Sequence, residues 1–465
     1  MNERGEMDQP GFNQRLTAAV SGDPGAGLVF LGNFEVEEVW ARGEAGLPRL
    51  TSAGNTAVVN RMDEFALLLG GADDHVVLKT EPDAGYLRYL GELGIALPTI
   101  HVVEEQQPGN TVTQDALADT ALLRVLGDLG ARGALLAPHG VSEIEEELSE
   151  RAGIALAAPP ADLCKSVNSK VYSRQAATAL GLRQPLGWTC STVVELFAAV
   201  DAAAELIDAG TAVMVKEAFG VSGKGISIIA STTRLRRLQR LVTNAARKSG
   251  VDRIAFVIEE RVAKVKDLNY QFTIARSGHV HLDFIKEAVT EGGVHLGHRF
   301  PPRLTPEQLG DIRHSADLLG KQLAADGFFG VVGVDAMIDP DGGVYPVIEI
   351  NARNNMSTYQ VRLQEQLVGE GQVVLARHYP LALREPLAFD SVRRQLDGLL
   401  LGGRGGAGLV INNFATVNAG SGTGEAFNGR LYGLVVADSQ AQLTALDAAV
   451  TARLQQLMEG NRDDR

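Results

Sequence analysis

This 465-residue chain has few cysteines, few aromatic residues and no excess of positive charge. Cys164 and Cys190 are too few for a disulfide framework and lack a CxxC spacing, which fits a reducing compartment such as the cytoplasm. Basic residues number 43 against 57 acidic ones, and the formal charge of −14 argues against nonspecific binding to nucleic acid. The apolar runs are too short to cross a bilayer, so we expect no membrane partner.

The chain does have enough apolar residues, 45%, to build two or three hydrophobic cores. Residues 1–25 are polar and predict a flexible tail. Over residues 26–160, short apolar strands alternate with helical patterns, which predicts a doubly wound α/β sheet. Pro159-Pro160 marks the expected boundary with residues 161–385, where hairpins and helices mix. A glycine-rich linker then precedes a small α+β domain at residues 386–465.

Two apolar stretches, residues 333–338 and 344–351, flank a turn-forming segment and predict a β-hairpin. Pairing of the residues beside the turn would place Asp335 diagonal to Glu349, about 7 to 8 Å away, with Asn351 on the same face. Carboxylate and amide oxygens suit Mg²⁺, which usually adds water and substrate phosphates to its shell. The hairpin therefore predicts a nucleotide-bound Mg²⁺, with Mn²⁺ as an alternative ion. A hairpin with merely solvated acids is the competing interpretation.

A glycine-rich loop lies between two predicted strands upstream of this hairpin. The first strand ends in Lys216, and residues 220–225 (Gly-Val-Ser-Gly-Lys-Gly) precede the second strand. Glycines let backbone N–H groups approach an anion closely, and the lysines add positive charge. The loop matches neither the common phosphate loop nor the dinucleotide-binding fingerprint. We interpret it as a phosphate-binding flap; a hairpin loop without a ligand is the alternative.

The apolar strand at residues 255–258 runs into Glu259, Glu260 and Arg261. Such a strand end can present backbone groups to adenine. Asp267 follows after a short polar stretch and can accept hydrogen bonds from ribose hydroxyls. The alternative is a strand end with solvated charges.

Taken together and in order, these motifs resemble the ATP-grasp carboxylate–amine ligases over residues 162–385. The resemblance implies a doubly wound pre-ATP-grasp domain at residues 26–160 and a two-lobed ATP-grasp domain at 161–385. The flanking segments look like the pheganomycin-type peptide ligases of natural-product biosynthesis. These segments are residues 59–64, 86–90, 93–98, 410–414 and 429–433.

The resemblance also implies a role for each matching residue. ATP would be bound by Lys170, Lys216, the flap residues Ser222, Gly223, Lys224 and Gly225, the hinge residues Glu259, Glu260 and Arg261, and Asp267 at the ribose. The Mg²⁺ ligands would be Asp335, Glu349 and Asn351. Lys286 matches a lysine that contacts phosphate in related ligases.

One position departs from the pattern of many amino-acid ligases in this superfamily. They have an arginine two residues before the first metal-binding aspartate, where this chain has Gly333. The spacing Glu349-x-Asn351-x-Arg353 instead resembles the carboxylase branch. Arg353 is therefore our candidate for stabilising a developing oxyanion, and a structural ion pair is its alternative role.

These roles predict an ATP-dependent ligase that phosphorylates an amino-acid-like acid and couples the acyl phosphate to the amine of a peptide or amino acid. An ATP-grasp kinase or a non-catalytic ATP sensor is the alternative. The residues identify neither the acid nor the amine. Substrate carboxylates would be bound by His298, Arg299 and Arg303. The C-terminal domain would narrow the acceptor groove or form a homodimer contact.

Overall fold

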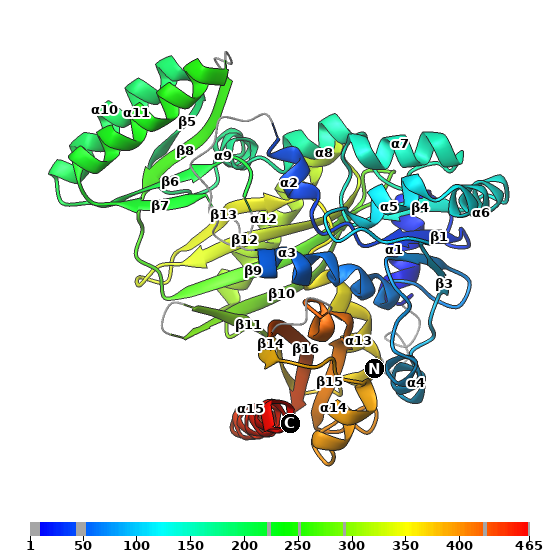
Figure 1. The fold of residues 1–465 in the computed structure, drawn as a ribbon. Helices are drawn as coiled ribbons and strands as arrows, with labels where there is room; N and C mark the ends of the chain where they lie inside the picture. The colour runs from blue at the N-terminus through cyan, green and yellow to red at the C-terminus, as the bar shows by residue number, and fades with distance from the viewer. Residues whose placement is uncertain are drawn as a thin grey trace, which may run out of the picture.

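The structure is a computed structural model that describes residues 10–42, 53–220, 225–249, 253–291, 294–421 and 426–463. An N-terminal α/β region lies beside a long central sheet, and a smaller sheet with two helices projects from one end of the molecule (Figure 1). The C-terminal helix lies at the opposite end. Among the described residues, none of the helices combines the length and the apolar character that crossing a membrane requires.

The N-terminal region is doubly wound, as predicted, with the parallel strand order β3-β2-β1-β4. Strand β1 is buried along its whole length, which explains its unbroken apolar sequence. The chain leaves β1 toward β2 on one side and returns as β4 on the other, so the carboxyl ends of β1 and β4 form a switch point where ligands of such sheets bind. The apolar segment at 154–157 forms only an isolated bridge between Leu136 and Leu156.

The elements of this region are β1 (Leu28–Leu31), α2 (Val36–Trp40), α3 (Ala53–Asn60), η1 (Met62–Leu68), β2 (His75–Leu78), α4 (Ala84–Glu92), β3 (Thr99–Val102), α5 (Val112–Ala118), α6 (Thr120–Ala131), β4 (Leu135–Pro138) and α7 (Glu143–Ala152). Helix α7 begins at a capping box. The Ser142 hydroxyl accepts a hydrogen bond from the backbone of the first helical turn, and the Glu145 carboxylate accepts one from the Ser142 backbone N–H.

The projecting lobe is an antiparallel sheet of order β5-β8-β6-β7, covered by two helices, and it has its own hydrophobic core. Helices α8 and α9 precede it. The elements are α8 (Ala161–Val167), α9 (Lys170–Ala179), β5 (Gly187–Thr192), α10 (Val193–Asp208), β6 (Val213–Glu217), β7 (Ile226–Ile229), α11 (Thr232–Ser249) and β8 (Arg253–Glu260).

The central sheet has the strand order β13-β12-β9-β10-β11-β14-β16-β15 within the described residues. Its elements are β9 (Lys266–Ile274), β10 (Val280–Glu291), β11 (Val294–Phe300), α12 (Pro306–Ala325), β12 (Gly330–Ile338), β13 (Val344–Asn351), η2 (Thr358–Gln360), α13 (Val361–Leu367), β14 (Val373–Leu383), α14 (Phe389–Gln395), β15 (Gly408–Asn413), η3 (Ala415–Asn418), β16 (Phe427–Ala437) and α15 (Gln440–Asp463).

The C-terminal residues do not form the separate domain that we expected after residue 385. Strand β14 pairs with β11 on one side and with β16 on the other, so β15 and β16 extend the central sheet. The glycine-rich segment at 402–408 is therefore a loop within one structural unit. Helix α15 packs through an apolar face, with Leu443, Val450 and Leu454 almost inaccessible to solvent.

The prediction of a flexible tail up to residue 25 is wrong for the part that the structure describes. Residues Phe12–Ser21 form helix α1, which packs against α13, β9 and β12. Phe12, Leu16 and Val20 are buried at i, i+4 and i+8. This apolar stripe was overlooked because polar residues separate its members.

Candidate active site

The predicted hairpin is present as β12 and β13, but its register differs from the continuous pairing that we expected from the turn onward. Ile338 pairs with Val344 as expected, and an irregularity beyond Met337 then brings Asp335 directly opposite Glu349. The shift amounts to two residues, so the alternation of faces is preserved. Asp335 and Glu349 are therefore closer neighbours than the diagonal pair we predicted. Pro346 lies in the irregular segment of β13, an edge strand, where its missing N–H does not interrupt a ladder.

A row of polar side chains crosses four strands on one face of the central sheet. Glu349 pairs with Asp335, Asp335 with Asn269, and Asn269 with Lys286. The Asn269 amide donates a hydrogen bond to Asp335 Oδ1 at 2.9 Å. Sequence reasoning missed Asn269, although polar and apolar residues alternate strictly along β9 and could have indicated a polar face.

The electrostatics of this row fit a divalent cation. Burial raises the pKa of Asp335 to about 6, and the facing Glu349 carboxylate acts in the same direction. Asn269 Oδ1 is buried without a hydrogen-bond partner in the described structure. A cation held by Asp335, Glu349 and Asn351 would offset the repulsion between the carboxylates, so these hard oxygen ligands fit Mg²⁺ or Mn²⁺.

Lys170 connects the hairpin of β12 and β13, which carries the predicted metal ligands and is called the metal-binding hairpin for that reason, to a cleft below the projecting lobe. It begins α9, so its charge lies beside the positive end of that helix. Its ammonium donates to Glu349 Oε1 at 2.6 Å and to the Gly220 carbonyl at 3.1 Å. Gly220 is the start of the glycine-rich loop, and one lysine therefore touches both predicted phosphate-facing elements.

The cleft brings together three of the residues assigned to ATP. Lys170, Lys216 and Glu259 line it, together with parts of α9, β8 and β13. The Lys216 ammonium forms an ion pair with Glu259, and all three side chains are largely buried. Buried cations are stable only with a partner, and Glu349 and Glu259 neutralise Lys170 and Lys216 respectively.

Arg174 is a cleft residue that sequence reasoning did not identify. It lies one helical turn after Lys170 in α9, and its guanidinium contacts Glu259 Oε2 at 3.4 Å and the Pro185 carbonyl at 2.7 Å. The i,i+4 spacing from Lys170 was a usable signal, because residues four apart lie on one helix face.

The structure describes only part of the glycine-rich loop to which ATP binding was assigned. Ser222, Gly223 and Lys224 lie outside the described residues. Gly225 has a φ of 79°, and a Cβ there would collide with the Glu217 carboxylate, so the end of the flap requires glycine.

The contacts of the hinge residues at the end of β8 indicate ATP binding less clearly. The Glu260 carboxylate accepts a hydrogen bond from the Leu186 backbone at 2.9 Å, and the Arg261 side chain is exposed. Asp267 is two residues before Asn269 in β9 and so shares its face, where Lys264 contacts it at 2.6 Å.

Lys286 is completely buried at the end of the polar row. Its ammonium donates to Gln360 Oε1 at 3.0 Å and lies 4.4 Å from the Phe284 ring. Burial lowers the pKa of Lys286 to about 7. This lysine can therefore change its protonation state near neutral pH, unlike an exposed lysine.

Arg353 lies just beyond the metal-binding hairpin and contacts two acceptors through one nitrogen. Its Nη2 forms an ion pair with Glu37 of α2 and donates to Asn351 Oδ1 at 3.0 Å. The absence of an arginine at Gly333 also has a structural cause. A Cβ at Gly333 would collide with the Asn355 amide. A positive charge near the predicted metal ligands therefore has to come from another part of the chain.

The three candidate substrate residues are separated by the structure. His298 pairs with Ala288 and lies on the face that carries Lys286. Arg299 pairs with Glu287 and so lies on the opposite face, and Arg303 is exposed beyond the end of β11. Of the three, only His298 shares the face of the metal-binding hairpin.

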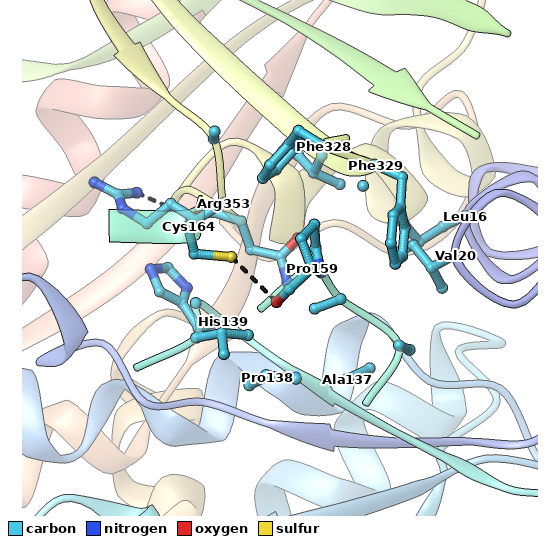
Figure 2. A pocket seen from close by; sticks show the side chains of 18 of the residues that line it. Leu16, Val20, Ala137, Pro138, His139, Pro159, Cys164, Phe328, Phe329 and Arg353 are labelled. Atoms are coloured by element: carbon cyan, nitrogen blue, oxygen red, sulfur yellow. Dashed lines mark hydrogen bonds between the residues drawn. The ribbon is translucent and has the colours of Figure 1, made fainter. Parts of the chain in front are cut away.

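The switch point of the N-terminal sheet meets the metal-binding hairpin at a cavity (Figure 2). Figure 2 shows Arg353 and His139 toward one end of this cavity and Phe328 and Leu16 toward the other. His139 Nδ1 lies 2.7 Å from the Tyr359 hydroxyl. Burial, aided by the charge of Arg353, holds the pKa of His139 well below its ordinary value, so the imidazole is neutral.

Comparisons with known proteins agree with this architecture. Residues 62–154 match the family described as the pre ATP-grasp domain, and residues 170–359 match the ATP binding domain of the carbamoyl-phosphate synthase L chain. A curated relative, the [butirosin acyl-carrier protein]–L-glutamate ligase of Niallia circulans, is 27% identical over 352 residues, which are 75% of this chain and 77% of the relative.

Solved structures share the fold at low sequence identity. The ADP complex of purK, N5-carboxyaminoimidazole ribonucleotide synthetase, has a TM-score of 0.52 at 14% identity and covers 93% of this chain and 97% of its own. The β-γ-ATP complex of biotin carboxylase from Campylobacter jejuni has a TM-score of 0.54 at 12% identity and covers 93% and 95%. The chain therefore has the domain composition of the ATP-grasp enzymes, a pre-ATP-grasp domain followed by an ATP-binding domain, and it is similar to a curated ligase.

Proposed function

We propose that this enzyme uses ATP to join an amino-acid-like carboxylic acid to the amine of a peptide or amino acid. ADP and phosphate would be the other products. The observation that carries the proposal is the position of Lys170, which contacts both the glycine-rich loop and the metal ligand Glu349. A nucleotide in the adjoining cleft would thus have its phosphates beside the acidic hairpin.

The reaction has two steps because a carboxylate resists attack by an amine. In the first, a carboxylate oxygen attacks the γ-phosphorus of ATP, the bond to the β-phosphate oxygen breaks, and ADP leaves. In the second, the amine attacks the acyl carbon, phosphate departs with the bonding electrons, and the amine nitrogen loses a proton. The first step depends on positioning and charge neutralisation rather than on a protein nucleophile.

The chain's own residues account for most of these requirements. Lys170 and Lys216 would exchange their carboxylate partners for phosphate oxygens when ATP enters the cleft. Asp335, Glu349 and Asn351 would hold Mg²⁺, which would neutralise the charge of the phosphates when bound. Arg353 would stabilise the oxyanion that forms when the amine attacks.

The curated relative supports the choice of substrates. Its name describes a ligase that acts on L-glutamate and the butirosin acyl-carrier protein. An amino acid as donor, and a role in making a natural product, agree with that name and with the resemblance to the pheganomycin-type peptide ligases. The same name favours a second candidate function, in which the acceptor is carried on an acyl-carrier protein rather than free in solution.

A screen of acid and amine pairs for ADP release, with mass analysis of the products, tests the proposal. We expect ADP and phosphate to form only when both partners are present, together with a product whose mass is the sum of the two minus water. Phosphate transferred to a stable product would indicate a kinase, AMP and pyrophosphate would indicate adenylation, and nucleotide binding without turnover would indicate a sensor. Running the screen with and without a loaded acyl-carrier protein separates the two acceptor classes.

A further inference from the structure

We propose that Glu37, supplied by the pre-ATP-grasp domain, is a positioning residue for Arg353 and keeps the metal site of the ATP-grasp domain attractive to a cation. The inference rests on the proposed function and names a residue that neither the motifs nor the comparisons assign. It makes the N-terminal domain a necessary part of the metal site.

The contacts around Arg353 show how Glu37 acts. The Arg353 guanidinium spans from Glu37 to Asn351 Oδ1 through the same Nη2 nitrogen, while Nη1 donates to the Asn354 carbonyl at 2.9 Å. The Arg353 and Glu37 side chains are only 10% and 11% exposed. Their ion pair is therefore poorly screened by water and strongly oriented.

Helix α2 holds Glu37 rigidly although it is only five residues long. Val36, Val39 and Trp40 are buried, and the Trp40 indole donates a hydrogen bond to the Val141 carbonyl at 2.9 Å. These anchors fix the helix against the loop after β4. Glu37 thus approaches Arg353 from a fixed base, as a residue that orients a site group must.

The charges near the hairpin explain why a carboxylate is needed. The acidic residues Asp335, Glu349 and Glu37 face the cations Lys170 and Arg353. With Glu37 present, acids outnumber bases by one, and the site attracts a divalent cation. Without it, the guanidinium beside Asn351 is unneutralised and repels a cation at the neighbouring ligands.

Three variants separate charge from shape. Glu37→Gln retains a hydrogen-bond acceptor but loses the charge, and Glu37→Asp retains the charge on a shorter side chain. Glu38→Gln is the matched control, because Glu38 is the next residue, is exposed and carries the same charge. The probe is Mn²⁺ in the presence of ADP, with the affinity measured by electron paramagnetic resonance on the full-length protein.

We expect Glu37→Gln to weaken Mn²⁺ binding about 10-fold, the usual effect of losing a group that orients a metal ligand. Glu37→Asp should recover part of the affinity, and Glu38→Gln should match the unaltered protein. In an Arg353→Met background, Glu37→Gln should have a much smaller effect on Mn²⁺ affinity, because no guanidinium remains to be neutralised. Equal losses in both backgrounds, or no loss in either, would overturn the proposal.

Unfolding by urea without metal gives an independent check of the coupling. Each single variant leaves one buried charge unpaired, so the loss of stability in the Glu37→Gln, Arg353→Met double variant should be less than the sum of the two single losses. Additive losses would show that the side chains do not interact. A purely structural role would show this coupling but leave Mn²⁺ affinity unchanged, which would also overturn the proposal.

Failure of this inference can be told apart from failure of the proposed function. If the unaltered protein binds Mn²⁺ with ADP but no acid and amine pair releases ADP, the ligase proposal fails while the role of Glu37 stands or falls on the affinities. If ligation occurs, Glu37→Gln should lower kcat about 10-fold to 100-fold with little change in KM for the amine. Normal kcat and normal Mn²⁺ affinity in that variant would overturn the role of Glu37 alone, and no Mn²⁺ binding by the unaltered protein would overturn both.

Discussion

Asp335 and Glu349 are like charges that face each other directly across two paired strands. Such a pair is destabilising in the absence of a cation, and the raised pKa of Asp335 reflects that cost together with burial. Lys170 relieves part of it by contacting Glu349 at 2.6 Å. The arrangement therefore lowers the stability of the folded protein, a cost that is expected if the two carboxylates form the proposed divalent-ion site.

Replacing Glu349 with glutamine should abolish ligation without unfolding the protein. Glutamine fits the same space but removes the charge that a cation and Lys170 require, so we expect at least about a 100-fold loss of ADP release. Circular dichroism and the urea midpoint should remain close to normal. Glu370→Gln, at an exposed turn, is the control. Full turnover in the Glu349 variant would refute the metal assignment.

Arg353→Ala should lower kcat about 100-fold to 1,000-fold, the usual effect of removing one oxyanion contact. Steady-state kinetics with a saturating acid and amine measure this. Arg353→Lys keeps a positive charge but loses the two-pronged geometry, so its rate should lie between those of Arg353→Ala and the unaltered enzyme. An unchanged rate for Arg353→Ala would leave the residue with its ion pair alone.

The buried Lys286 predicts an unusual dependence of stability on pH. An unfolded lysine keeps its proton until about pH 10.5, whereas burial lowers the pKa of Lys286 in the folded protein to about 7. Between these values the unfolded state binds more protons, so this lysine makes the free energy of unfolding rise with pH from about 7 to 10.5. Lys286→Met should remove that rise in urea unfolding curves, whereas Lys321→Met, at an exposed position of α12, should not.

At the scale of residues, the motif spacing identified side chains that the fold brings together, but not the side chains that contact them. Lys170, Lys216 and Glu259 line one cleft, and Asp335 faces Glu349, because residue types carry the chemistry. Asn269, Arg174 and Glu37 were missed. Each contacts another polar side chain of the candidate site, and such contacts depend on tertiary neighbours. Arg299 lies on the face opposite Lys286, because the strand register decides which face a side chain joins.

Among the elements, helix α1 is the one whose importance the sequence concealed. Leu16→Ala should lower the free energy of unfolding by about 2 to 5 kcal/mol, since the side chain is buried where α1 meets the central sheet. Gln14→Ala on the exposed side of the same helix should change it by less than about 0.5 kcal/mol. Urea denaturation of the full chain compares the two. Similar values would mean that α1 does not dock in solution.

The hairpin shows why elements are easier to predict than their pairing. Apolar runs on either side of a turn-forming segment predicted both strands of the hairpin to within three residues, because each signal is local. The irregularity beyond Met337 is not local, since it depends on how β13 bends at the sheet edge. Its shift of two residues left the polar face intact, which is why Asp335 and Glu349 still lie on one face as predicted.

For the whole molecule, nucleotide binding should be measurable as stabilisation. A ligand at about 100 times its Kd that binds only the folded state adds about 2.7 kcal/mol. We expect ATP with Mg²⁺ to raise the Tm, and a chelator to reverse most of the rise. Lys216→Met should reduce the shift, because the lysine lines the cleft. A shift that is unaffected by both changes would place the nucleotide elsewhere.

Local sequence patterns predicted the fold of the N-terminal region but were misleading at the C-terminal end of the chain. The alternation of strands and helices marked the doubly wound N-terminal region. The glycines at 402–408 resembled a linker, yet the strands on either side belong to one sheet with β14. Pairing between β16 and β14 joins residues about fifty positions apart, and a local pattern cannot report such a distant partner.

The sheet that runs without interruption from β13 to β15 also determines how a finished product can depart. Its strands cannot separate without breaking the hydrogen bonds between them. The projecting lobe of β5 to β8 instead has its own hydrophobic core, and two short connecting segments, near residues 186 and 262, join it to the rest of the molecule (Figure 1). Release of ADP should therefore proceed by a swing of that lobe about those crossings, with the acid-bearing hairpin as the stationary floor.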